Sequence, residues 1–273
     1  MRGAGIPLSS TSETNTDALI SDQASINASH PAAETRSLTL ILVRHGETAW
    51  NANGKIQGHL DVPLSDVGRE QARRLGRRFQ SAFSPTTPQP LLPHFGKTPL
   101  SIAAQFSSDL ARAQETGHIV RDAVPTLAEV PLLSTALLRE RNFGEWQGLE
   151  AEELRLRRTG GNNEPPNGET EVQVFERMSR ALLYVFANTP TVEGGSHRNV
   201  VVYGHGGSLR VFLCLSLGLG AQETRRFRLE NTSLSVIEIS GIVHSGKLEI
   251  RNGRFVCVNE TAHLLLPEFS TPG

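Results

Sequence analysis

Two short segments of the sequence place a histidine next to glycine directly after an apolar run. Arg44-His45-Gly46 ends the run LILV, and Gly204-His205-Gly206 ends the run NVVVY. A third segment, SSDLAR, brings Arg112 shortly after the apolar stretch 100–106. A neutral imidazole is a competent nucleophile toward phosphorus, since its ordinary pKa of ~6.5 leaves it mostly unprotonated at neutral pH. Arginine forks bind anionic oxygens and neutralise a transferring group. The pattern predicts a site for a dianion, and a phosphoryl group fits best.

These segments converge only if the runs before them belong to one sheet. In an open α/β sheet the ligand binds beyond the carboxyl ends of the strands. Helix N-termini at that edge offer free N–H groups, and glycine lets a ligand approach the backbone closely. Arg112 is expected one turn into a helix, from which it reaches back over the helix N-terminus. Strand-like and helix-like stretches alternate along the chain, as such a sheet requires.

We therefore expect one α/β domain over residues 38–267, a three-layer α/β/α sandwich with a mostly parallel central sheet. Strands are expected over Leu38–Val43, Leu100–Phe106, Thr126–Leu133, Asn199–Tyr203, Ser233–Ile239 and Leu248–Val258. Helices are expected after the caps Ser65-Asp66 and Ser108-Asp109, from Glu169 to about Ala187 and from about Ser208 to Leu217.

Other stretches have the composition of tails and loops. Residues 1–37 are rich in Ser, Thr, Ala and Asn without periodicity, which predicts a disordered tail, and 268–273 form a short C-terminal tail. The proline-rich stretch 84–99 is interpreted as a surface insertion. The Gly/Pro-broken segment 159–168 is interpreted as a mobile lid that admits water.

The overall composition argues against several classes of function. Lys and Arg number 27 against 28 Asp and Glu, for a formal net charge of −1. This balance predicts no contact with nucleic acid or an acidic membrane, and no apolar run is long enough to cross a bilayer. Cys214 and Cys257 form no CxxC pattern and no signal peptide is visible, so we expect reduced thiols and a cytoplasmic location. Oligomeric state leaves no signal in the sequence.

Breaking a phosphomonoester requires a proton for the departing alkoxide, and the segment LLRERNFGEWQG supplies two carboxylates. Glu140 follows an apolar pair of leucines and stands between Arg139 and Arg141, whereas Glu145 lies further along. Glu140 is the preferred general acid. Its alternative role is a structural ion pair with a neighbouring arginine, and the alternative for Glu145 is a solvated loop charge.

With RHGETAWN, SSDLARAQET, LRERNFGEWQG and YGHGGSLR in this order, the chain resembles the histidine phosphatase superfamily. The likeness runs from about residue 38 to 265, and it is to the branch with cofactor-dependent phosphoglycerate mutases and small-molecule phosphatases. It implies that His45 becomes a phosphohistidine and that Glu140 donates the proton. It also implies that Arg44, Arg112 and His205 bind the phosphoryl group, assisted by Asn51 and the Gly206 backbone, and that Thr48, Gln57 and Gly58 line the substrate side. No metal ion and no other cofactor are implied.

The resemblance favours a phosphomonoesterase that acts on a small phosphorylated metabolite. Family mutases carry a longer segment after the acid, with a lysine and paired arginines. Here the stretch after Glu140 is shorter and contains no lysine, although Arg157-Arg158 could mimic the arginine pair. Mutase-type phosphotransfer therefore remains the alternative. The substrate stays open among sugar phosphates, bisphosphates, nucleotides and phosphoglycerates.

Two rival classes are weaker. A metal hydrolase is disfavoured because no HxH, HExxH or DxD spacing gathers ligands, and because the arginines would repel the ion. A non-catalytic pseudophosphatase that binds a partner is expected to lack the nucleophile, an arginine or the acid, and none of these is missing.

Overall fold

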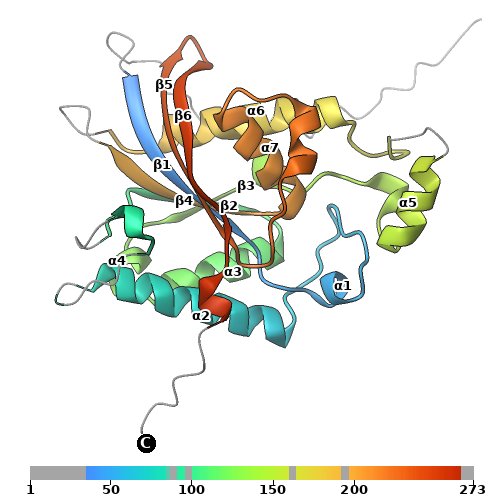
Figure 1. Cartoon of the computed structure of the whole chain (residues 1–273), viewed down its shortest axis with the longest axis horizontal. Helices are drawn as coiled ribbons and strands as arrows, with labels where there is room; N and C mark the ends of the chain where they lie inside the picture. Colours follow the sequence, from blue (N-terminus) through green and yellow to red (C-terminus); the bar gives the residue numbers. More distant parts are fainter. Residues whose placement is uncertain are drawn as a thin grey trace, which may run out of the picture. The chain divides into compact units, whose positions relative to one another are not determined.

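The computed structural model describes residues 35–84, 86, 91–95, 100–159, 164–191 and 197–265, which build one sheet with helices on both faces (Figure 1). The strands are β1 (Thr35–Arg44), β2 (Ala104–Ser108), β3 (Leu132–Thr135), β4 (Arg198–Gly204), β5 (Leu234–His244) and β6 (Lys247–Glu260). Their order across the sheet is β3-β2-β4-β1-β5-β6. The first four of this order run parallel, and β5 pairs antiparallel with β1 and β6. The carboxyl ends of β2, β4 and β1 therefore lie at one edge of the sheet.

Helices connect and cover these strands. The α-helices are α1 (Ala49–Ala52), α2 (Asp66–Phe83), α3 (Ala111–Asp122), α4 (Pro125–Ala128), α5 (Ala151–Thr159), α6 (Glu171–Asn188) and α7 (Gly206–Ser216). Short 3-10 turns are η2 (Pro93–Phe95), η3 (Ala136–Leu138), η4 (Gly144–Trp146), η5 (Ala221–Arg226) and η6 (Ala262–Leu264). As predicted, Ser65 caps α2, because its side chain accepts from the Gly68 N–H.

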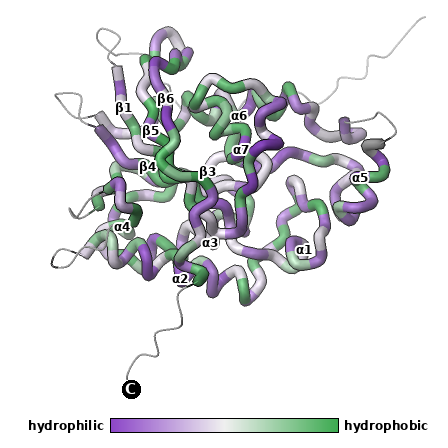
Figure 2. Tube along the Cα trace, viewed as in Figure 1, coloured by the Kyte–Doolittle hydropathy of each residue, from purple (hydrophilic) through white to green (hydrophobic). Residues whose placement is uncertain are grey.

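Alternate residues of β1 face two helical layers. Leu40 and Leu42 belong to the apolar core that contains α6 and α7, whereas Ile41 and Val43 belong to the core that contains α2 and α3. This is the period-two alternation of a strand buried on both faces. Figure 1 shows α2 and α3 on one side of the sheet and α6 and α7 on the other, and in Figure 2 hydrophobic and hydrophilic residues alternate along α2. The predicted three-layer α/β fold with a mostly parallel sheet is confirmed.

The first strand begins earlier than the sequence predicts. Thr35, Arg36 and Ser37, assigned above to the tail, pair antiparallel with residues 240–242 of β5. These residues are polar and lie where the strand leaves the core, so no apolar run marks them. The rest of the predicted tail, residues 1–34, lies outside the described residues, as does the segment 268–273.

The strand predictions after α2 need two corrections. β2 begins at Ala104 instead of Leu100. The predicted strand Thr126–Leu133 is wrong, because Pro125 opens the short helix α4, and β3 follows only at Leu132. Proline suits the first helical turn, where its missing N–H costs nothing, and that signal outweighs the β-branched residues nearby.

Two predicted loops are more ordered than expected where they are described. Leu91 and Leu92 of the stretch 84–99 are 0 % and 5 % exposed and pack in the core with α2, so this part is not a surface insertion. Within the predicted lid, Pro166 O accepts from Glu145 N over 3.0 Å, and Asn167 donates to the Glu145 carboxylate over 2.9 Å. Pro166 and Asn167 of the predicted lid therefore contact η4. Residues 85, 87–90, 96–99 and 160–163 lie outside the described part.

Candidate active site

His45 directly follows β1 and is buried, with 3 % of its surface exposed. Its backbone N–H donates to Gly204 O over 2.9 Å, which joins it to the end of β4. The ring nitrogen Nδ1 lies 2.6 Å from Gly46 O. Because a carbonyl oxygen can only accept, this contact assigns the proton to Nδ1. Nε2 of His45 is then the nitrogen with the free lone pair.

His205 is the N-cap residue of α7, and its ring centroid lies 5.2 Å from that of His45. Ser108 Oγ, at the end of β2, lies 2.8 Å from Nε2 of His205. The same hydroxyl oxygen accepts from Leu110 N over 3.3 Å, so its hydrogen is available to Nε2. Donation from this hydroxyl to Nε2 places the His205 proton on Nδ1, a buried atom without a partner among the described residues; the hydroxyl's second lone pair also permits the opposite tautomer. In the tautomer with the proton on Nδ1, His205 offers a donor where His45 offers a lone pair.

Both histidines are held neutral. Burial lowers the pKa of His45 well below its ordinary value, and the charges of Arg44 and Arg112 lower this pKa further. The pKa of His205 is lowered by burial first and then by the charge of Arg112. Desolvation and nearby positive charge both disfavour imidazolium. The imidazole of His45 is thus unprotonated at neutral pH, as a nucleophile must be.

Arg44 and Arg112 supply the positive charge of the site. Arg44, the last residue of β1, donates from Nη1 to Leu229 O over 2.6 Å. Arg112, in the first turn of α3, is 1 % exposed and donates to Leu60 O and Gly58 O, each over 2.8 Å. Burial lowers the pKa of both guanidiniums, to about 10 for Arg112, so both remain charged at neutral pH. In the described part of the chain the Nε of each is buried without a partner.

Glu140 lies at the first turn of α7. Its Oε2 accepts from Gly207 N over 2.8 Å, and its Oε1 accepts from Ser208 N over 3.0 Å and from the N–H of the next residue over 2.8 Å. The carboxylate thereby satisfies N–H groups that a helix start leaves unpaired, where negative charge is stabilised. Its charge also raises the pKa of Arg44 and Arg112 against the effect of burial.

Glu140 does not form the structural ion pair with a neighbouring arginine that was the alternative to its role as general acid. Arg139 instead holds Asp109 with two hydrogen bonds of 2.7 and 2.6 Å. Arg141 pairs with Glu164 over 2.6 Å. Neither neighbouring arginine pairs with Glu140, whose carboxylate is bound by backbone N–H groups.

Thr48 and Asn51 form the start of α1. Each side chain accepts from the other residue's backbone N–H, the reciprocal arrangement called a capping box. Asn231 donates from Nδ2 to His45 O over 2.9 Å and to Asn51 Oδ1 over 3.4 Å, which ties this cap to the nucleophile. The predicted roles of both residues toward substrate stay predictions.

The three remaining predicted residues also border this site. Gly58 has a φ of +56°, and its carbonyl holds Arg112. Gln57 is 7 % exposed, and its Oε1 is buried without a partner among the described residues. Gly206 is the first residue of α7, and a Cβ there would lie 3.3 Å from Arg44 Nε. The structure thus brings the predicted residues to the edge where β1, β2 and β4 end.

Comparison with known proteins decides the family. A family model described as histidine phosphatase superfamily (branch 1) matches residues 40–87 and 91–245. The chain belongs to the histidine phosphatase superfamily. It is 33 % identical over 214 residues to phosphoglycerate mutase-like protein 4 of Arabidopsis thaliana, covering 73 % of this chain and 79 % of the relative. It is 29 % identical over 201 residues to 2,3-bisphosphoglycerate-dependent phosphoglycerate mutase 2 of Gloeobacter violaceus, covering 70 % and 81 %.

Among solved structures, the mycobacterial glucosyl-3-phosphoglycerate phosphatase is similar to this histidine phosphatase-fold chain with a TM-score of 0.62 and 26 % identity. The match covers 81 % of this chain and 98 % of that one. Members of the superfamily are phosphatases or mutases, and the similar proteins include both kinds.

Two residues of this superfamily member have other roles than the sequence suggests. Ser108 and Asp109 do not cap α3, whose N-cap residue is Leu110 without a side-chain cap bond. Asp61 binds the helix start instead, because its Oδ1 accepts from Ala111 N over 2.8 Å. Ser108 faces His205, a role that sequence reasoning missed because Ser-Asp before a helix is also the common cap signal.

Sequence reasoning also missed Arg177 of α6. It is 8 % exposed and binds the backbone around Glu140. A signal existed, because Arg177 follows Val174 by three positions and precedes Met178 and Ala181 on the buried side of the helix. An arginine in an apolar stripe calls for buried acceptors.

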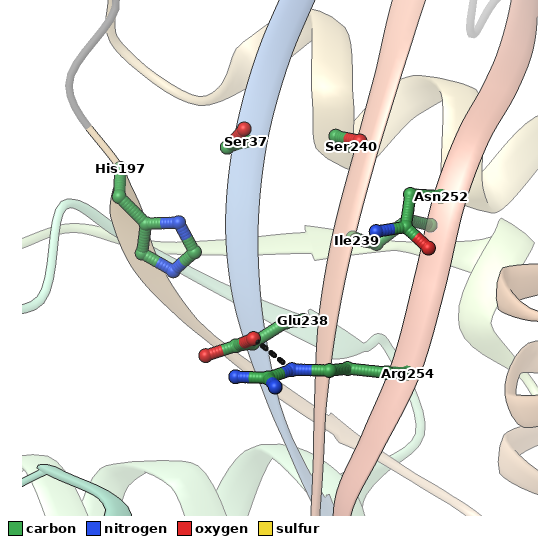
Figure 3. Close-up of a pocket in the computed structure, with 7 residues that line it drawn as sticks. All are labelled: Ser37, His197, Glu238, Ile239, Ser240, Asn252 and Arg254. Atoms are coloured by element: carbon green, nitrogen blue, oxygen red, sulfur yellow. Dashed lines mark hydrogen bonds and ion pairs between the residues drawn. The ribbon is translucent and has the colours of Figure 1, made fainter.

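A pocket elsewhere on this superfamily member contains none of the predicted site residues. It lies over β1, β5 and β6, and Figure 3 shows Arg254 bound to Glu238 among its lining residues. His94 Nε2 also lies 2.6 Å from a Glu238 carboxylate oxygen, so this carboxylate has two side-chain partners. Nowhere in the described ranges do three His, Cys, Asp or Glu side chains gather as metal ligands do, and no helix in those ranges is long and apolar enough to cross a membrane.

Proposed function

We propose that this protein is a phosphomonoesterase that hydrolyses a small phosphorylated metabolite through a phosphohistidine at His45. The observation that carries the proposal is the state of that ring: buried, neutral, protonated on Nδ1 by its bond to Gly46 O, and therefore basic at Nε2. The charges of Arg44 and Arg112 act on this ring, and their Nε atoms have no partner in the described part of the chain.

In the first step the phosphoryl oxygens are bound by Arg44, Arg112 and the Nδ1–H of His205. Nε2 of His45 attacks phosphorus while the bond from phosphorus to the leaving oxygen breaks. Glu140, protonated for this step, gives its proton to that oxygen, so the product leaves as an alcohol. The arginines balance the charge that develops on the equatorial oxygens.

In the second step water attacks the phosphohistidine. Glu140, now a carboxylate, accepts a proton from the water, and the bond from nitrogen to phosphorus breaks. Orthophosphate leaves and His45 returns to its neutral form. Glu140 is bound at the N-terminus of α7, so the same oxygen atoms are in place for both steps.

The helix after the acid favours a phosphatase over a mutase. Of the pair Arg157-Arg158, a candidate to hold the carboxylate of a phosphoglycerate, Arg157 pairs with Glu153 on its own helix over 2.8 Å, and the side chain of Arg158 lies outside the described residues. Arg155 likewise pairs with Glu152 over 2.7 Å. The charges of Arg155 and Arg157 on α5 are thus compensated within the helix. A mutase-type phosphotransferase remains the second candidate, because the relatives in Arabidopsis thaliana and Gloeobacter violaceus are named as mutase-like and mutase proteins.

The test is a phosphate-release screen with purified protein over phosphorylated sugars, glycerates and nucleotides. One further arm measures interconversion of 2- and 3-phosphoglycerate primed by bisphosphoglycerate. We expect phosphate release that a chelator does not reduce, and no primed interconversion. Interconversion faster than phosphate release would identify a mutase. Absence of turnover on every substrate, p-nitrophenyl phosphate included, would favour a pseudophosphatase.

A cytoplasmic location is part of the same proposal. It is supported by Cys214 and Cys257, which are both free thiols, as expected in a reducing compartment.

A further inference from the structure

The backbone that carries Glu140 rests on a buried arginine from another part of the chain. We propose that Arg177 of α6, together with Glu169, is a positioning residue that holds the Glu140 carboxyl where it can protonate the leaving group. This inference rests on the proposed function, because it assigns Arg177 a role through the general acid.

Arg177 binds three backbone carbonyls, that of the acid itself and those of two residues before it. Its Nη1 donates to Leu137 O and Arg139 O, each over 2.9 Å, and its Nη2 donates to Glu140 O over 3.1 Å. Residues 139–142 belong to no strand or helix, so their carbonyls are not paired by the hydrogen-bond pattern of a strand or helix. A buried carbonyl without a donor is costly, and the planar guanidinium with its five N–H groups serves several of them at once.

Glu169 fixes the orientation of that guanidinium. Its Oε1 accepts from Arg177 Nε over 2.6 Å and its Oε2 from Nη2 over 2.8 Å, the two-bond geometry in which arginine and carboxylate orient each other. Glu169 also accepts at Oε2 from Asn142 N over 2.7 Å, and its carbonyl accepts from Arg141 Nε over 2.8 Å. The pair therefore holds the chain at residues 137 to 142.

His59 adds a contact at the same point. Its Nε2 lies 2.8 Å from Glu140 O, the carbonyl that Arg177 also binds. Since a carbonyl only accepts, His59 donates from Nε2, and burial together with the nearby charge of Arg177 keeps the pKa of His59 below its ordinary value. The carbonyl of Glu140 thus has two donors.

Glu140 is therefore bound at both of its ends. Its carboxylate is held by Gly207 N and Ser208 N, and its backbone by Arg177 and His59. A side chain that must meet a leaving oxygen within hydrogen-bond distance gains from both constraints, since small displacements reduce proton transfer strongly. Removal of Arg177 leaves the carboxylate its helix partners but releases the backbone that sets its reach.

A purely structural role for Arg177 predicts a different result from a positioning role. Loss of stability alone lowers the amount of active enzyme and reduces activity on all substrates by one factor. Loss of the acid's position reduces activity only where the leaving group needs a proton. p-Nitrophenolate leaves without being protonated, whereas an alkoxide needs a proton in order to leave.

The experiment compares Arg177→Met and Arg177→Lys with the control Arg180→Met, an exposed arginine three positions further along the same helix. For each, kcat/KM is measured on p-nitrophenyl phosphate and on an alkyl phosphate such as glycerol phosphate, with the folded fraction determined by circular dichroism. For Arg177→Met we expect a loss of about 30-fold or more on the alkyl ester and less than about 3-fold on the aryl ester. Arg177→Lys is expected to fall between this variant and wild type, and Arg180→Met to match wild type.

Equal losses on both esters, or no loss, would overturn the positioning role. If Arg177→Met does not fold, Glu169→Gln and Arg177→Lys give the same comparison with milder changes. A Glu140→Gln arm separates this inference from the proposed function. If Glu140→Gln itself lacks selectivity for the alkyl ester, the acid assignment is wrong. If Glu140→Gln is selective and the Arg177 variants are not, only the positioning role is wrong.

Discussion

The Glu140 carboxylate accepts a hydrogen bond of 2.8 Å from the backbone N–H of Gly207, at a place where any side chain on residue 207 would overlap it. The glycine-rich segment after β4 thus serves the acid as well as the phosphoryl site. Gly206 leaves room beside Arg44, and Gly207 leaves room for the carboxylate. The N-terminus of α7 holds both His205 and the Glu140 carboxylate. This helix therefore sets the distance between the two side chains.

Gly207→Ala is expected to separate activity from stability. The new Cβ displaces the carboxylate of Glu140, so kcat/KM on an alkyl phosphate should fall by about 10-fold or more. Alanine stabilises a helix by up to about 1 kcal/mol relative to glycine, which offsets part of the stability lost with the displaced Glu140 contact. The melting temperature should therefore fall little. In a Glu140→Gln background the same substitution should cost little further activity. An equal loss in both backgrounds would mean that Gly207 acts on something else.

Ser108→Ala is expected to weaken phosphoryl binding through His205. Without the Ser108 hydroxyl, Nε2 of His205 loses the partner that can keep the ring proton on Nδ1. We expect KM to rise and kcat/KM to fall by about 10-fold, on aryl and alkyl esters alike, because the acid is untouched. Ser108→Thr keeps the hydroxyl and serves as the control. A loss confined to alkyl esters would contradict this assignment.

Arg112→Lys is expected to fail although the charge is kept. Lysine cannot bind Gly58 O and Leu60 O together and still present a donor to a phosphoryl group. We expect kcat/KM to fall by about 100-fold or more. Arg121→Lys in the last turn of the same helix is the control. Wild-type kinetics for Arg112→Lys would show that a point charge is sufficient there.

His263 is expected to make stability depend on pH. Burial lowers its pKa to about 3, with smaller effects from the charges of Arg78 and Arg74. The unfolded chain binds a proton near pH 6.5 and the folded chain does not, so stability from this group is complete above about pH 6.5 and is lost as the pH falls. At about pH 5 the loss amounts to about 2 kcal/mol.

The measurement is urea unfolding at about pH 7.5 and about pH 5 for wild type, His263→Gln and the exposed control His118→Gln. His263→Gln should lose about 2 kcal/mol less between the two pH values than wild type. His118→Gln should behave as wild type. If both variants show the wild-type difference, His263 is not the group that titrates.

Much of the site could be predicted from the sequence, because a buried strand and the glycine that follows it can be recognised from neighbouring residues alone. His45 and His205 each stand directly after a buried run, and the parallel sheet then brings them to one edge. The cap of α3 was not accessible, since the residue that binds the helix start is Asp61, which lies 50 positions before Ala111. Local patterns favoured Ser108 and Asp109, whose side chains turn out to bind His205 and Arg139.

Arg177 shows a second limit of local reasoning. A helical arginine is usually solvated, and the Glu169 carboxylate together with the backbone carbonyls of residues 137, 139 and 140 explains why this one is buried. Those carbonyls need a donor because the short turn η3 ends at Leu138 and residues 139–142 belong to no strand or helix, which no residue pattern in that segment reveals. The early start of β1 at Thr35 also depends on residues distant in the sequence, because polar residues there pair with β5.

The most direct test of the account is to trap the phosphorylated enzyme. Wild-type protein mixed with substrate and quenched within milliseconds should carry one phosphoryl group, which is acid-labile and maps to the peptide that contains His45. His45→Asn should carry none and should lose at least about 1,000-fold in kcat. Label on His205 instead, or normal turnover by His45→Asn, would contradict the assignment of His45 as nucleophile.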